Sequence, residues 1–239
     1  MVELRLAQQI SPVSQDTSAR PNRFERRSHY YIARTMIVLP RLYAIVDAST
    51  IASGEQAIPF VKELAGAGCL VLQYRNKSGN ARAMLDQARD LKRYLGNSVR
   101  LIMNDRADLC LAADFDGVHV GQDDLSPESV RKIIGPERWL GVSTHNPEQL
   151  READLTSADY LAIGPVFSTS SKENPDPVVG LEGVRRARAL TKKPLVAIGG
   201  ITRANAASVI EAGADSVAVI SDLLREPRKS AEEFFRVLR

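Results

Sequence analysis

The chain has 239 residues, of which 44% are hydrophobic and 26% charged, a composition typical of a soluble globular protein. Its formal net charge is +3, and residues 1–40 alone carry six Arg and three acidic residues (6 − 3 = +3), so the rest of the chain is neutral overall. A neutral domain argues against a nucleic-acid partner. No apolar run approaches the ~20 residues that a membrane span needs.

The first 38 residues differ from the rest, and we predict an extension over 1–38 followed by one domain over 39–239. Residues 11–28 are rich in Ser, Pro, Arg and Asn without helical or strand periodicity, which favours a flexible linker, whereas residues 2–10 have the pattern of a short helix. An alternative start at Met36 leads directly into the first predicted strand. Either interpretation is favoured over a targeting sequence, because the extension has no apolar signal core.

The two cysteines, Cys69 and Cys110, lie inside apolar segments and form no CxxC pair. This placement favours buried free thiols in a reducing compartment, so we expect a cytoplasmic protein. The sequence pattern does not specify an oligomeric state.

Eight short, nearly continuous apolar runs predict strands that are buried on both faces, as in a parallel sheet. These strands are expected at 41–46, 69–74, 99–103, 117–120, 139–143, 159–163, 194–198 and 215–220. The segments between them have helical spacing, and 80–95 carries a clear apolar stripe. Ser126-Pro127 and Asn146-Pro147 are typical helix starts. Strict alternation of eight strands and helices predicts a single (β/α)8 TIM barrel.

A TIM barrel places the carboxyl ends of all its strands around one mouth, so polar residues at those ends are candidate site residues. Gln73, Arg75 and Lys77 alternate at the end of the second strand and are expected to face the same side. An Arg and a Lys at this place suit a phosphate or diphosphate group.

Carboxylates follow the next two strands, at Asn104-Asp105 and at Asp123-Asp124. Without neighbouring His or Cys they suit a hard cation such as Mg²⁺, which takes its other ligands from water and phosphate oxygens. The alternative for Asp124 is capping of the following helix, a role that Ser126 also fits.

The last three strands end in residues suited to a second phosphate. A long loop over 164–180 contains Thr169-Ser170-Ser171-Lys172, and Gly199-Gly200 and Ile220-Ser221 end the seventh and eighth strands. Loops at these two strand ends commonly bind phosphate in such barrels. Two anion sites and a metal indicate a reaction between two phosphorylated molecules, whose organic groups the pattern leaves open.

At these positions the sequence resembles the thiamine-phosphate synthase (thiamine-phosphate pyrophosphorylase) family from about Arg41 to Leu224. The resemblance is carried, in order, by Gln73-x-Arg75-x-Lys77, Asn104-Asp105, the run from Gly117 to Leu125, Gly141-Val142-Ser143-Thr144-His145, the run from Gly164 to Lys172, and Ala197-Ile198-Gly199-Gly200-Ile201. The visible departure is Ser171, where the family usually has Thr.

The resemblance implies a transferase that joins 4-amino-2-methyl-5-(hydroxymethyl)pyrimidine diphosphate to 4-methyl-5-(2-phosphoethyl)thiazole, giving thiamine phosphate and pyrophosphate. It implies that pyrophosphate leaves first, forming a pyrimidine methyl cation. The pyrimidine diphosphate is then expected to be bound by Gln73, Arg75, Lys77, Asn104, Ser143 and Lys172, of which Arg75, Lys77, Ser143 and Lys172 would be catalytic. The thiazole phosphate would be bound by Thr169, Ser170, Ser171, Gly200, Ile220 and Ser221. Asp105 and Asp124 would hold Mg²⁺.

Two alternatives stay open at this point. A thiazole tautomerase-like isomerase needs neither the Gln-x-Arg-x-Lys set nor two metal carboxylates. A non-catalytic regulator that binds thiamine phosphates would use the same binding residues, with the basic extension as its contact to a partner.

Overall fold

The computed structural model describes residues 37–48, 50–51, 54–169 and 176–239. Most of the predicted extension, and with it Met36, lies outside these ranges, so the boundary at residue 38 stays a prediction. Within the described ranges, none of the helices has the length and apolarity that crossing a membrane requires.

Eight parallel strands form a closed barrel in chain order, with β1 paired to β8 as well as to β2. The TIM-barrel prediction is therefore confirmed, and each predicted strand differs from the observed one by two residues or fewer at either end. The strands are β1 (Leu42–Asp47), β2 (Val71–Arg75), β3 (Arg100–Asn104), β4 (Gly117–Val120), β5 (Trp139–Thr144), β6 (Tyr160–Ile163), β7 (Leu195–Ile198) and β8 (Ser216–Val219).

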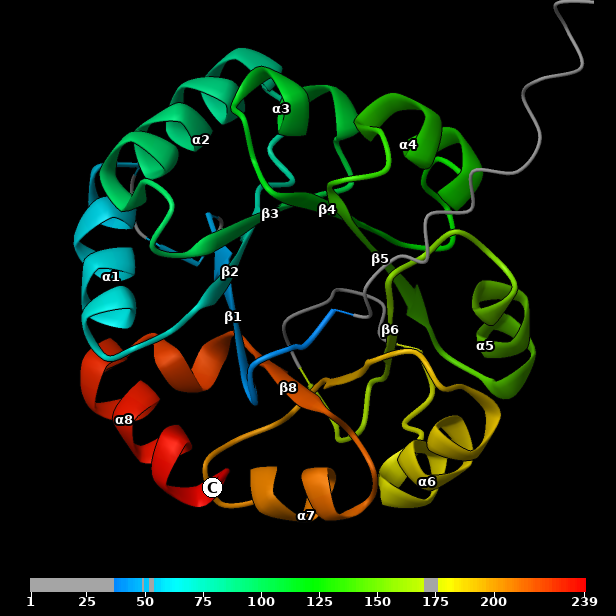
Figure 1. The fold of residues 1–239 in the computed structure, drawn as a ribbon. Coiled ribbons are helices and arrows are strands. Elements are labelled where there is room, and N and C mark those ends of the chain that lie inside the picture. The colour runs from blue at the N-terminus through cyan, green and yellow to red at the C-terminus, as the bar shows by residue number, and fades with distance from the viewer. Residues whose placement is uncertain (1–36, 49, 52–53, 170–175) are drawn as a thin grey trace, which may run out of the picture. The chain divides into compact units, whose positions relative to one another are not determined.

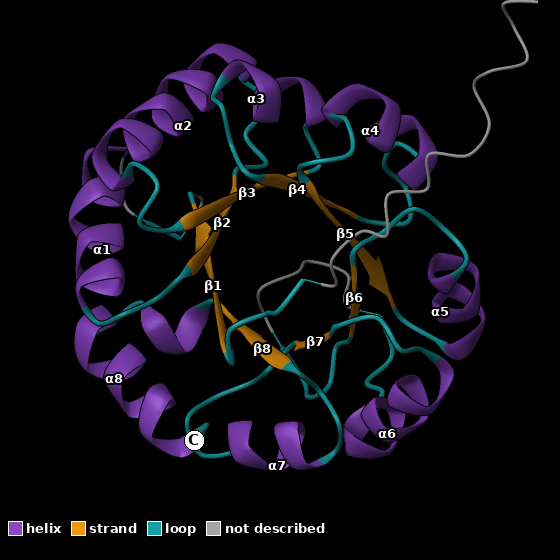
Figure 2. Ribbon diagram, viewed as in Figure 1, coloured by secondary structure: helices purple, strands orange, loops and turns teal. Residues whose placement is uncertain are grey.

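The helices form a ring around the barrel, as Figures 1 and 2 show. They are α1 (Gly54–Gly66), α2 (Ala81–Leu95), α3 (Ala107–Ala112), α4 (Pro127–Ile134), α5 (Pro147–Asp154), α6 (Gly180–Leu190), α7 (Ala206–Glu211) and α8 (Pro227–Val237), with a 3₁₀ turn, η2 (Ser221–Leu223), after β8.

Local sequence explains where these helices begin and which side they bury. In α2 the apolar stripe buries Met84, Ala88, Leu91 and Leu95 against the barrel. The Oγ of Ser126 accepts a hydrogen bond from the backbone N–H of Ser129 and so caps α4 (Pro127–Ile134). The predicted helix starts at 127 and 147 are both confirmed.

The apolar core has two layers because successive side chains of a strand point to opposite faces. The outer layer lies between strands and helices and includes Leu42, Ala44 and Val46 of β1. The inner layer fills the barrel and includes Tyr43 and Ile45 of the same strand. This alternation decides which residues of each strand reach the barrel mouth.

Candidate active site

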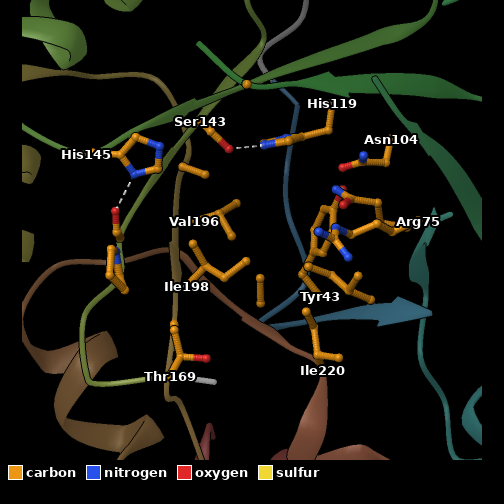
Figure 3. Close-up of a pocket in the computed structure, with 18 of the residues that line it drawn as sticks. Tyr43, Arg75, Asn104, His119, Ser143, His145, Thr169, Val196, Ile198 and Ile220 are labelled. Carbon is orange, nitrogen blue, oxygen red and sulfur yellow. Dashed lines mark hydrogen bonds between the residues drawn. The ribbon is translucent and has the colours of Figure 1, made fainter. Parts of the chain in front are cut away.

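A cavity of about 490 Å³ lies at the carboxyl ends of the strands (Figure 3). It brings together eleven of the fourteen site residues predicted from the sequence: Gln73, Arg75, Lys77, Asn104, Asp105, Asp124, Ser143, Thr169, Gly200, Ile220 and Ser221. The other three, Ser170, Ser171 and Lys172, lie outside the described residues. Residues from seven separate strand ends thus line one cavity.

The end of β2 supplies the first polar side of the cavity. Gln73 and Arg75 face inward, whereas the intervening Tyr74 belongs to the outer core layer. The Arg75 guanidinium forms an ion pair with Asp47, a carboxylate at the end of β1 that is almost fully buried. Because Asp47 fixes it on one side, Arg75 presents its remaining N–H groups from a constrained position.

Lys77 and two carboxylates lie beside one another at the mouth. The Lys77 ammonium donates to the Asp105 carboxylate. Burial raises the pKa of the Asp105 carboxyl, the neighbouring Asp124 raises it further, and Lys77 opposes both effects. Asp124 accepts a hydrogen bond from the Gly121 N–H at 2.7 Å, so it orders its own loop and leaves helix capping to Ser126.

This pair of acidic residues fits a magnesium ion that is shared with a substrate. Mg²⁺ commonly takes one or two protein carboxylates and completes its octahedron with water and phosphate oxygens. Asp124 is close enough to raise the pKa of the Asp105 carboxyl, and a divalent cation bound beside them would oppose that effect. Among the described residues no group of three or more His, Cys, Asp or Glu could hold a metal, so the donor set does not suit a structural zinc site.

The loops after β6, β7 and β8 form the facing side, and Thr169 and Ile220 lie across the cavity from Ser143 and His119 in Figure 3. Gly199 and Gly200 have φ of 100° and 63°, in the left-handed region that favours glycine. A Cβ on Gly200 would lie 2.4 Å from the Ser168 carbonyl oxygen. These glycines therefore let two loops approach closely enough to form one wall.

Three buried polar residues that line the cavity were missed by the sequence prediction: Tyr43, His119 and Tyr160. The Tyr43 and Tyr160 hydroxyl oxygens are 2.9 Å apart, and Tyr160 Oη is 3.1 Å from His119 Nδ1. His119 Nε2 lies 2.8 Å from Ser143 Oγ (dashed in Figure 3). Gln73 Nε2 donates to Tyr43 at 3.0 Å. A chain of hydrogen bonds thus connects Gln73 to Ser143.

Burial fixes the ionisation of this chain. It lowers the pKa of His119 to about 4, so the ring is neutral near pH 7. It raises the pKa of Tyr43 and Tyr160, so both phenols keep their hydrogens. The chain therefore consists of neutral groups and provides no strong acid or base.

The alternation of side chains along a strand places these tyrosines on the inward face, and this could have been seen in the sequence. Tyr43 lies two residues before Ile45, and Tyr160 two residues before Ala162, both of which line the cavity. Both tyrosines lie inside apolar runs, where their pattern is that of ordinary core residues, whereas most of the polar residues that predict the site follow the strands. Only the closed barrel, whose interior brings inward positions of β1, β4 and β6 together, identifies them as polar partners.

His145, which the sequence prediction also left without a role, connects two loops at the mouth. Its Nδ1 is 2.6 Å from the Gly164 carbonyl oxygen and 3.5 Å from the Asp176 carboxylate. It therefore links the end of β5 to both ends of the loop between β6 and α6.

The arrangement suits two anionic ligands bound face to face. Cationic side chains and paired carboxylates lie at the ends of β2, β3 and β4, whereas hydroxyl and backbone groups lie at the ends of β6, β7 and β8. Between them the floor carries apolar side chains, including Val196 and Ile198 (Figure 3). Such a floor fits flat organic rings between two charged ends.

Comparison with known proteins gives a consistent result. A family model described as thiamine monophosphate synthase matches residues 42–223. A thiamine-phosphate synthase of Koribacter versatilis is 62% identical over 203 residues, covering 84% of this chain and 96% of that protein. One from Chloroflexus aurantiacus is 45% identical over 184 residues, covering 76% and 83% respectively.

A solved structure is similar as well. The thiamine phosphate pyrophosphorylase from Pyrococcus furiosus superposes with a TM-score of 0.74 at 31% sequence identity, covering 83% of this chain and 95% of that one. The matched region in these comparisons spans most of each protein.

Proposed function

Because the chain belongs to the thiamine monophosphate synthase family, and is thus a transferase, we propose that it joins the two substrates which that resemblance implies. The pyrimidine methylene carbon of 4-amino-2-methyl-5-(hydroxymethyl)pyrimidine diphosphate is transferred to the nitrogen of 4-methyl-5-(2-phosphoethyl)thiazole. The carbon–oxygen bond breaks, pyrophosphate departs with the electron pair, and a carbon–nitrogen bond forms. The products are thiamine phosphate and pyrophosphate.

The observation that carries this proposal is the two-sided cavity. The side formed by Arg75, Lys77 and Asn104 suits the diphosphate, and the side formed by Thr169, Gly200 and Ser221 suits the single phosphate. Two anionic substrates held at opposite ends of an apolar floor have their organic rings turned toward one another. Such alignment makes the reaction of two separate molecules effectively unimolecular, which lowers its entropic barrier.

In this proposal, leaving-group stabilisation is the main chemical task of the side chains. Arg75, held by Asp47, stabilises the negative charge that grows on the diphosphate as the bond breaks, and Lys77 adds a second charge from a more exposed position. The pyrimidine amino group stabilises the methyl cation. No proton has to leave the thiazole nitrogen, which agrees with a floor of neutral groups.

Asp105 and Asp124 would hold Mg²⁺, which when bound neutralises charge on the diphosphate. In the same proposal Lys77 turns from Asp105 toward the diphosphate, since it is about half-exposed and its ammonium has room to move. Ser143 and Asn104 orient the pyrimidine end, and Lys172 adds a further cation from the loop after β6.

The test is a product assay on purified protein with both substrates and Mg²⁺. We expect thiamine phosphate and pyrophosphate in equal amounts, and no product when EDTA removes the metal. Omission of either substrate is the control. Folded protein that binds both substrates but gives no product contradicts the proposal and favours the regulator. Isomerisation of the thiazole without pyrimidine diphosphate favours the tautomerase.

A further inference from the structure

The hydrogen-bond chain that lines the cavity is formed by side chains from five strands. Gln73 comes from β2, Tyr43 from β1, Tyr160 from β6, His119 from β4 and Ser143 from β5. Tyr43 and Tyr160 are at most 1% exposed, and His119 is 8% exposed. All five residues line the cavity, and Ser143, at the end of the hydrogen-bond chain, is the one whose exposure is intermediate while the other four are buried. Apolar side chains could fill this part of the barrel without needing any hydrogen-bond partners. Buried polar side chains are costly unless each one is hydrogen-bonded, so their arrangement here must satisfy their donors and acceptors.

The backbone makes room for the chain at Gly141. This glycine is paired with His119 on one side and with Tyr160 on the other. A Cβ at Gly141 would lie 2.2 Å from the Tyr160 ring carbon Cζ and 2.4 Å from His119 Nδ1. Any other residue would separate the phenol from the imidazole, so the contact between them depends on this glycine.

The donors and acceptors of the chain are satisfied in one direction. Gln73 donates through Nε2 to the Tyr43 oxygen, so the Tyr43 hydrogen has the Tyr160 oxygen as its acceptor. The Tyr160 hydrogen then points to His119 Nδ1, which must be an unprotonated acceptor. With Gln73 donating to Tyr43, a hydrogen bond from Tyr160 to Tyr43 would leave the Tyr43 hydrogen buried without an acceptor among the described residues, which is unfavourable.

A neutral imidazole that accepts at Nδ1 carries its hydrogen at Nε2. His119 Nε2–H therefore donates to Ser143 Oγ, the group 2.8 Å away. The Ser143 oxygen is then already an acceptor, and its own hydrogen is directed elsewhere. The cavity is the side from which Ser143 is accessible.

We propose that Tyr43 and Tyr160 are positioning residues that hold His119 in the Nε2-protonated tautomer and thereby make the Ser143 hydroxyl a hydrogen-bond donor to the bound substrate. Neither tyrosine contacts the substrate in this account; each acts through the next group of the chain. The substrate atom opposite Ser143 must be an acceptor, such as a ring nitrogen of the aminopyrimidine. That last identification rests on the proposed function, whereas the tautomer does not.

Nitrogen NMR of protein labelled with ¹⁵N-histidine tests the tautomer without any substrate or metal. The protein has three histidines, His29, His119 and His145. The signals that disappear from the spectrum of a His119→Gln variant are therefore those of His119. We expect His119 to show a protonated Nε2 and an unprotonated Nδ1 at pH 7.5. A ring protonated at Nδ1 overturns the proposal, since it requires Gln73 to present its amide oxygen and the whole chain to run in reverse.

Substitution of the tyrosines tests whether they set this state. Tyr160→Phe removes the donor to Nδ1, so we expect the two His119 nitrogen signals to move toward each other as the tautomers exchange. Tyr43→Phe leaves that donor in place and should have a smaller effect. The matched control is Tyr74→Phe, a buried phenol of the outer layer that donates to Gln87, and it should leave the His119 signals unchanged. An unchanged His119 spectrum in Tyr160→Phe contradicts the proposal.

Kinetics separate the positioning role from a structural one. If Tyr160 acts through Ser143, Tyr160→Phe and Ser143→Ala each lower kcat/KM, and the double variant is no slower than Ser143→Ala alone. Multiplying effects in the double variant would show that Tyr160 acts independently of Ser143 and would overturn that step. Should the wild-type protein lack activity, the proposed function fails while the NMR result still decides the tautomer.

Discussion

Arg75 and Lys77 carry the same charge but are held in different ways. Arg75 is anchored by the buried Asp47, and its side chain is 22% exposed, whereas the Lys77 side chain is 53% exposed. An anchored guanidinium is preorganised for a planar, bidentate contact with phosphate, and a mobile ammonium follows charge as it develops. The two residues therefore contribute differently to binding a phosphate group. The contribution of Arg75 also depends on Asp47, which can be tested by substitution.

Asp47→Asn should lower kcat by about tenfold or more, because Arg75 loses the carboxylate that orients it and small misplacements of a clamp are costly. Steady-state kinetics with both substrates measure this. The control is Asp90→Asn, which removes a carboxylate from an exposed pair with Arg93 and should leave kcat within about twofold. Equal effects of the two variants would contradict the positioning role of Asp47.

Asp105→Asn should lower kcat/KM by about 100-fold or more while the protein stays folded, because the proposed metal loses a charged ligand. Asparagine is the informative choice, since Asp105 has a φ of 62° and asparagine tolerates this conformation better than alanine. Activity is measured over a range of Mg²⁺ concentrations, and thermal unfolding checks the fold. Wild-type turnover at every Mg²⁺ concentration would show that Asp105 is not a ligand of a catalytic metal ion.

His119 should make the metal-free protein less stable in acid. Unfolded histidine binds a proton near pH 6.5, whereas the folded site does so only near pH 4, so between these values the unfolded state binds more protons. Stability is fully present above about pH 7, falls as the pH decreases from there toward about 4, and the loss amounts to about 3 kcal/mol.

The measurement is the unfolding free energy of wild type and His119→Gln in urea between pH 4 and 8, with EDTA present. The two proteins share all other titrating groups, so the difference between their curves reports His119. We expect the wild-type curve to fall more steeply toward pH 4. Parallel curves would show that His119 is not held neutral by burial.

Among the secondary-structure elements, the pattern of apolar residues was sufficient to predict the strands and helices of the barrel. Strands buried on both faces have continuous apolar runs, and the amphipathic stripe of α2 and the caps at Ser126 and Asn146 marked the helices. Eleven of the fourteen residues predicted at the strand ends line the cavity for the same reason, since a parallel barrel gathers those ends by topology.

The polar chain inside the barrel could not be predicted in this way. Its contacts depend on strand register, on Gly141 leaving space, and on side-chain rotamers, none of which appears in a local pattern. Asp47 is a second example: it ends β1 as polar residues end other strands, but its role follows from its contact with Arg75 on the next strand.

Gly200 offers a test of the wall between the β6 and β7 loops. Gly200→Ala should raise KM for the thiazole phosphate, because a Cβ would meet the Ser168 carbonyl oxygen at 2.4 Å and push the loops apart. Gly135→Ala has a similar φ of 75° with open space around it, so it measures the backbone cost alone, about 1–2 kcal/mol.

Kinetics with each substrate varied in turn measure the effect, and thermal unfolding compares the two variants. We expect Gly135→Ala to retain wild-type KM values. A KM for thiazole phosphate that stays unchanged in a folded Gly200→Ala protein would show that this wall does not shape the phosphate site.

At the scale of the whole molecule, barrel closure brings β2 and β3 to face the ends of β6, β7 and β8 across one mouth. The cation-rich side and the hydroxyl-rich side are distant in sequence and belong to opposite arcs of the barrel. We propose that each side binds one substrate, so that the closed barrel itself aligns the reacting rings.

The most direct measurement is calorimetric titration of each substrate alone, which excludes turnover, into wild type, Arg75→Gln and Ser221→Ala. Arg75→Gln should raise the Kd of pyrimidine diphosphate by about tenfold or more and leave the Kd of thiazole phosphate within about twofold of the wild-type value. Ser221→Ala should do the reverse. Loss of the same substrate in both variants would contradict a cavity with two separate anion sides.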